Sequence, residues 1–110
     1  MAFAKVDLGV GATQITWDPI TGAVGDTEVE LKGSKPLAGS VQVISGTPGS
    51  FTLQGSNDGS NWATLKDLQG NAIALTALGA MAEFTTAARY VRPLGDASSS
   101  AAVCRVVFRG

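Results

Sequence analysis

The sequence predicts an all-β domain, a compact antiparallel β-sandwich or jelly-roll-like barrel of about eight to ten short strands. Glycine is abundant, at 14 of 110 residues, and Gly, Ser, Thr and Asn interrupt the chain every several residues. Short runs rich in Val, Ile, Thr, Phe and Leu lie between these interruptions, as is typical of sandwiches and barrels. No segment carries a convincing helical stripe, because the best candidate, 72–82, reads equally well as two short strands around a turn.

The expected strands follow one another along the chain, and together residues 13–110 are expected to form one domain. Residues 1–12 are expected to be either a mobile N-terminal arm or a first edge strand. The range 27–32 alternates most cleanly, with Val29 and Leu31 on one side and charged residues on the other, so it should be half-buried. The expected strands are 6–8, 14–17 (stopping at Asp18-Pro19), 27–32, 39–45, 50–55, 62–66, 73–75, 81–85, 88–93 (ended by Pro93) and 102–109.

A hairpin is predicted where Asn57, Asp58 and Gly59 separate two of these strands. The Asp-Gly pair is the strongest hairpin signal in the chain. Asp58 could bind Ca²⁺ together with Asn57 and Asn61, but hydrogen bonding within their own turn is the favoured interpretation. Trp62 opens the return strand, where packing in the core or between the sheets is favoured over a stacking platform for a sugar.

The last expected strand places Cys104, Val106 and Phe108 on one face. Cys104 is the single cysteine, so the chain cannot form an internal disulfide, and its apolar setting favours a buried structural thiol. A cytosolic folding compartment fits this cysteine usage. The start of the chain, with Lys5 after the first apolar residues, does not have the pattern of a signal peptide.

The composition argues against catalysis. The sequence has no histidine, which removes the commonest general base and metal ligand. Cys104 therefore lacks a histidine partner, and no glycine-rich phosphate-binding loop is present. We expect no enzymatic activity, no catalytic residue, no cofactor and no metal site. The net charge of −1 argues against nucleic acid as a partner, and no stretch is long enough to span a membrane.

Five residues are candidates for an interface with a partner. Trp17, before Asp18-Pro19, is either an interface anchor or a core-edge residue. Arg89 and Arg92 belong to one expected strand, and Arg105 and Arg109 belong to another. If those strands pair, a modest basic stripe results that could meet acidic patches on a neighbouring subunit; a solvated strand face is the default interpretation.

Two segments carry a resemblance to known families. Residues 51–65, Phe-Thr-Leu-Gln-Gly-Ser-Asn-Asp-Gly-Ser-Asn-Trp-Ala-Thr-Leu, resemble the discoidin (coagulation factor 5/8 type C) family, in which such a strand end leads to a Trp strand. Residues 88–92 are similar to a later Ala-Arg-Tyr-Ile-Arg strand of that family. The hairpin, the Ala-Arg-Tyr-Val-Arg-Pro strand and the terminal strand ending in Arg resemble still more a class of small tailed-phage virion proteins, similar to capsid decoration proteins.

The phage resemblance implies a non-enzymatic capsid decoration (cement) protein. Such a protein would be a homo-oligomer on the outside of the phage head and would stabilise joints between subunits of the major capsid protein, after assembly in the host cytoplasm. The low content of charged residues, 15%, fits a surface partly covered by a partner. The alternative is a carbohydrate-binding or adhesin-like module of a phage tail, against which the small number of aromatic residues counts.

Overall fold

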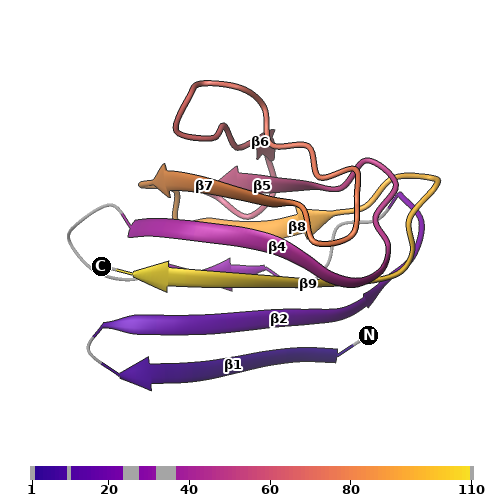
Figure 1. The fold of residues 1–110 in the computed structure, drawn as a ribbon. Helices are drawn as coiled ribbons and strands as arrows, with labels where there is room; N and C mark the ends of the chain where they lie inside the picture. Colours follow the sequence, from indigo (N-terminus) through magenta and orange to yellow (C-terminus); the bar gives the residue numbers. More distant parts are fainter. Residues whose placement is uncertain (1, 10, 24–27, 32–36, 110) are drawn as a thin grey trace.

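The computed structural model describes residues 2–9, 11–23, 28–31 and 37–109 of the chain. These residues form two antiparallel sheets packed face to face, without a helix (Figure 1). The predicted all-β sandwich is therefore confirmed. No helix long and apolar enough to cross a membrane occurs in the described ranges.

Nine strands are assigned within the described ranges. They are β1 (Ala2–Gly9), β2 (Ala12–Ile20), β3 (Val29–Glu30), β4 (Leu37–Thr47), β5 (Thr52–Ser56), β6 (Ala63–Thr64), β7 (Met81–Thr86), β8 (Tyr90–Leu94) and β9 (Ser100–Arg109). Sheet A has the order β1-β2-β9-β4-β7, and sheet B has the order β3-β8-β5-β6. The first and last strands thus lie in one sheet, with β9 between β2 and β4 (Figure 1).

The core lies between the sheets and follows the alternation of the strands. On β9, Cys104, Val106 and Phe108 are buried, as their shared face predicts, whereas Val103 and Arg105 are only partly covered. Trp17 is the largest fully buried side chain. The core consists of Ile15, Trp17, Ile20, Val29, Val41, Val43, Phe51, Leu53, Ile73, Leu75, Phe84, Val91, Cys104, Val106 and Phe108.

Gly39 of β4 makes room for an aromatic pair in this core. It lies opposite Phe84 on β7 and opposite Phe108 on β9. The two rings meet edge to face, with centroids 5.9 Å apart and planes at 88°. A Cβ at position 39 would lie 2.7 Å from Cζ of Phe84. The phenyl ring thus occupies the space that a side chain at position 39 would need.

Several predicted elements differ from the structure. β8 runs through Pro93 to Leu94, so this proline does not end its strand, and of 62–66 only Ala63–Thr64 is a strand. β2 continues through Asp18-Pro19 to Ile20, and its pairing with β9 shifts register between Trp17 and Ile20, so the proline is taken up at an irregularity instead of ending the strand. Within 27–32, only Val29–Glu30 is a described strand; residues 24–27 and 32–36 lie outside the described ranges. Leu75 makes an isolated bridge with Phe51, and Ile73 is buried beside it without forming a strand.

Candidate interaction surfaces

The loop that joins β5 to β6 is built around the carboxylate of Asp58. Its Oδ1 accepts hydrogen bonds from the backbone N–H groups of Ser60 and Asn61, both at 2.8 Å, and its Oδ2 accepts one from Nδ2 of Asn61 at 2.6 Å. The hydroxyl of Ser56 contacts the same carboxylate. The backbone donors of Asn61 and Ser60, followed by the Asn61 and Ser56 side chains, hold the pKa of Asp58 well below its usual range. Gly59 takes a positive φ of 77° there.

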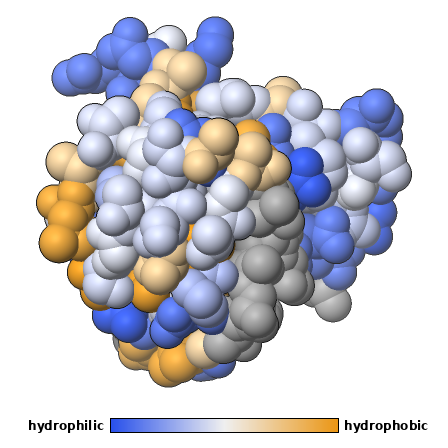
Figure 2. All heavy atoms as spheres, turned by 90° about the vertical axis from the view of Figure 1, so that its right-hand side faces the viewer, coloured by the Kyte–Doolittle hydropathy of each residue, from blue (hydrophilic) through white to orange (hydrophobic). Residues whose placement is uncertain are grey.

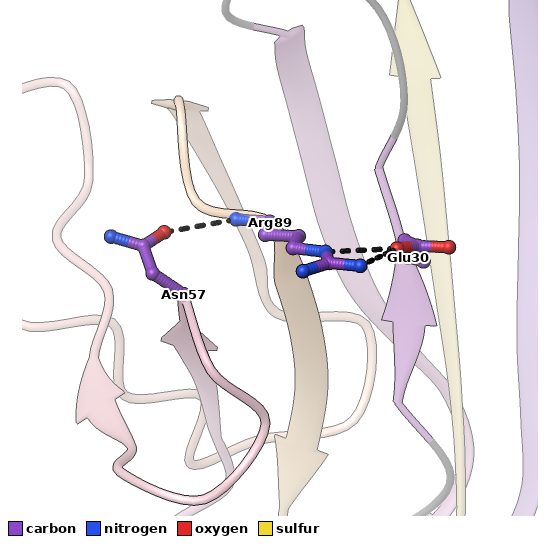
Figure 3. Close-up of polar contacts among 3 residues, drawn as sticks. All are labelled: Glu30, Asn57 and Arg89. Atoms are coloured by element: carbon purple, nitrogen blue, oxygen red, sulfur yellow. Dashed lines mark hydrogen bonds and ion pairs between the residues drawn. The ribbon is translucent and has the colours of Figure 1, made fainter.

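The side chain of Asn57 points away from this turn and toward the start of β8 (Figure 3). Its Oδ1 accepts the backbone N–H of Arg89 at 3.1 Å. The guanidinium of Arg89 forms an ion pair with Glu30, with Nη2 and Oε2 2.9 Å apart, and lies 5.0 Å from the ring centroid of Tyr90. The hydrogen bond to Glu30, followed by the charges of Tyr90 and Glu30, raises the pKa of Arg89. These contacts join the hairpin loop, β8 and β3.

Trp62 lies on the outer face of sheet B and not in the core, so the favoured core placement is wrong. The guanidinium of Arg92 stacks over the indole at 4.2 Å, and Nε of Arg92 donates a hydrogen bond to Oε1 of Gln54 at 2.9 Å. Val91 and Pro93, on either side of Arg92, are buried, so alternation turns Arg92 outward. We call Trp62, Arg92, Arg89, Tyr90 and Glu30 the arginine–aromatic face.

The basic stripe that would follow from pairing of the two arginine-bearing strands does not form among the described strands. Arg89 and Arg92 belong to β8 or its start in sheet B, whereas Arg105 and Arg109 belong to β9 in sheet A, so the two strands do not pair. Nε of Arg105 donates instead to Oγ1 of Thr16 within sheet A, at 3.1 Å.

Trp17 cannot be the half-exposed interface anchor that its place before Asp18-Pro19 suggested. Its side chain is 0% exposed. The predicted strand ended at Trp17, but β2 continues to Ile20. The indole of Trp17 therefore lies on the inner face of the sheet and not at a strand end.

Sheet A presents an open edge at β1, which the sequence indicated only through a weak alternation. The side chains from Ala4 to Gly9 are all exposed, with Val6 and Leu8 at 46% and 45%. Lys5 and Asp7 alternate with these apolar residues. β1 is the lowest element in Figure 1, and hydrophobic atoms reach the corresponding lower margin of Figure 2.

The other sheet edges in the described ranges are shorter or partly covered. At the far side of sheet A, the backbone N–H of Leu68 donates to the carbonyl of Glu83 on β7, at 3.1 Å, so a loop lies against that edge. In sheet B, the edge strands β3 and β6 have two residues each. No group of three or more His, Cys, Asp or Glu side chains that could hold a metal is found in the described part of the chain.

The described residues thus form a two-sheet β-sandwich in which β1 is a long, exposed edge strand. No family model matches the chain, and no curated protein matches its sequence. A solved structure described under the words "Bacillus endospore appendages form a novel family of disulfide-linked pili" is similar, with a TM-score of 0.50 and 23% sequence identity. The match covers 99% of this chain and 90% of that chain. At this identity the likeness shows a shared fold.

The comparison contradicts the expectation of a phage capsid decoration protein bound to a major capsid protein. The similar structure belongs to a bacterial surface appendage and not to a virion. No finding supports the tailed-phage or discoidin resemblance, and the phage-tail alternative falls with them. The motifs that suggested those families are structural parts of the two sheets: the hairpin loop and β8 belong to sheet B, and the terminal strand β9 belongs to sheet A.

Proposed function

We propose that this chain is a non-enzymatic structural subunit that assembles with copies of itself into an appendage on the outside of a cell. The observation that carries the proposal is the extent of the likeness to the Bacillus pilus structure, which takes in 99% of this chain and 90% of the other. The pilus-like sandwich therefore accounts for nearly all of the residues given.

The surface supports this role, because large apolar side chains lie exposed on several sides of the sandwich. A repeating assembly can bury such side chains at many identical joints, so that modest single contacts add up. Figure 2 shows hydrophobic atoms along the left and lower margins of the molecule. The exposed large hydrophobic residues are Val6, Leu8, Ile44, Leu68, Leu78 and Met81.

Assembly in this chain would be non-covalent. The similar Bacillus structure comes from disulfide-linked pili, whereas Cys104 is the single cysteine here. Its thiol is 0% exposed in the core, so a bond to another copy would require the sandwich to open. The contacts between copies would thus rest on surface side chains and backbone groups.

The non-enzymatic part of the proposal rests on how the charged groups are used. Asp58 accepts hydrogen bonds from its own turn, and Glu30 pairs with Arg89. These two carboxylates are thus engaged in structural contacts. The sequence also has no histidine that could act beside a carboxylate as a general base.

Electron microscopy and sedimentation of the purified chain at rising concentration test the proposal. We expect regular filaments that pellet equally with and without a reducing agent. Met81→Glu, which charges an exposed apolar side chain on β7, should reduce pelleting, whereas Ala97→Glu adds the same charge in an exposed turn between β8 and β9 and should not. A chain that stays monomeric and never pellets would overturn the proposal.

A further inference from the structure

We infer that β1 is a homodimerisation strand, through which two copies of this chain pair antiparallel about a two-fold axis at Val6. The inference goes beyond the proposed function and does not depend on it, because a dimer can form with or without a filament.

The first argument is the state of the sheet edges. An edge strand exposes backbone N–H and C=O groups that can pair with another chain. β1 is eight residues long and exposed from Ala4 to Gly9, while β7 has a loop bonded against it through Leu68 and Glu83. With one long open edge among the described strands, pairing between two copies must join β1 to β1, which is the isologous arrangement of a two-fold dimer.

The second argument is the order of residues along β1, which is self-complementary about Val6. In an antiparallel pair centred there, Lys5 lies opposite Asp7 of the partner subunit, and Asp7 lies opposite the partner subunit's Lys5. Opposite charges in directly facing positions stabilise a strand pair, and like charges destabilise it. The residues next outward, Ala4 and Leu8, are both apolar. Ala4 lies in the regular part of β1, whereas Leu8 lies at a register shift between Asp7 and Gly9, where Oδ1 of Asp7 also accepts the backbone N–H of Gly9 at 2.8 Å.

The arrangement also gives a role to the charged residues Lys5 and Asp7 on this edge strand. A charged side chain on an edge strand normally discourages pairing with other sheets. Here Lys5 would discourage every partner strand except one that offers a carboxylate opposite it, and β1 of a second copy offers Asp7. The charges of Lys5 and Asp7 thus disfavour pairing of β1 with unrelated strands and favour its antiparallel pairing with β1 of a second copy.

A charge-complementation experiment tests the dimer. Lys5→Asp gives a strand with two negative charges, and Asp7→Lys gives one with two positive charges. Because two attractive pairs become two repulsive ones, each variant alone should raise the dimer dissociation constant at least about tenfold in analytical ultracentrifugation. The two variants mixed should form a heterodimer at least as tightly as the original chain forms its homodimer. Loss of folding cannot imitate this recovery.

Matched controls change the same charges away from β1. Lys66→Asp and Glu28→Lys alter exposed residues of the same types. Alone and mixed, they should leave the dimer unchanged at equal ionic strength. If they weaken it as much as the β1 variants do, the effect is one of net charge, and the proposal fails.

Cysteine cross-linking tests the position of the axis. Val6→Cys should give a disulfide-linked dimer under mild oxidation, since facing residues of an antiparallel pair lie within disulfide range. Ala4→Cys and Leu8→Cys should not link to themselves, because each would lie about 13 Å from its own copy. The buried thiol of Cys104 gives no background reaction. Equal linking at all three positions would refute the two-fold axis at Val6.

Failure of this inference can be told apart from failure of the proposed function. Filaments without the position-6 cross-link would remove the dimer and leave the appendage proposal standing. A cross-linked dimer that never forms filaments would support the β1 dimer and overturn the appendage proposal. A chain that remains monomeric at its solubility limit would remove the dimer.

Discussion

Gly39 should not tolerate even a methyl group, because the ring of Phe84 occupies the space above it. In Gly39→Ala the new Cβ would lie 2.7 Å from Cζ and 3.1 Å from both Cε atoms of Phe84, closer than the 3.4–4 Å of ordinary contact. Overpacking of this kind costs about 1–3 kcal/mol. Replacing glycine by alanine in a strand recovers roughly 0.5–1 kcal/mol of chain entropy. The net loss of stability should therefore be about 1 kcal/mol, within a range of about 0–2.5 kcal/mol.

Urea unfolding followed by far-UV circular dichroism measures this loss, and a double-mutant cycle identifies its cause. Each kcal/mol should lower Tm by roughly 4–8 °C in a domain near this size. In the background of Phe84→Leu, whose shorter side chain frees the space, Gly39→Ala should cost much less or become neutral. An equal cost in both backgrounds, or a neutral Gly39→Ala in the original chain, would show that the ring does not set the tolerance at this position.

Three further predictions concern single side chains. Cys104 should react with a thiol reagent only at the rate of unfolding, since it is 0% exposed; rapid labelling of the folded chain would contradict its burial. Acrylamide should quench the fluorescence of the partly exposed Trp62 more than that of the buried Trp17. In Trp62→Phe, the remaining emission of Trp17 should therefore be blue-shifted and protected from the quencher. Because hydrogen bonds lower the pKa of Asp58, its carboxylate favours the folded state above the ordinary pKa of about 3.9 and loses this effect as the pH falls toward the lowered value. Asp58→Asn should therefore flatten the acid side of a Tm-against-pH profile, and an unchanged profile would contradict the role of the turn.

The sequence predicts the fold class and the inner faces of strands because both follow from local patterns. Alternation alone places Cys104, Val106 and Phe108 together, and they are buried in β9. Which strands become neighbours depends on contacts between distant segments, which alternation does not encode. The condition for an arginine stripe is not met for this reason, since Arg92 and Arg105 lie on strands of different sheets.

The two tryptophans show the same limit at the level of single residues. Trp17 was expected near a strand end, but β2 passes through Pro19 at an irregularity and keeps the indole inside. Trp62 was expected inside, but it precedes the two-residue strand β6 at the edge of sheet B, where Arg92 covers its outer face. In both cases the burial of the indole depends on the contacts made by its strand or loop in the folded sandwich, which local alternation does not specify.

The failure of the family resemblance has a physical cause in the hairpin itself. Ser56 and Asp58 accept the backbone N–H groups of the turn, and Gly59 supplies its positive φ. Any β-sandwich that turns a strand in this way gains from the same residues at the same spacing, whatever the protein does. A Gly-Ser-Asn-Asp-Gly match therefore reports the chemistry of a loop. The residues of the proposed β1 dimer, Lys5 and Asp7, lie instead on an exposed edge strand, and their pairing would depend on a second copy of that strand.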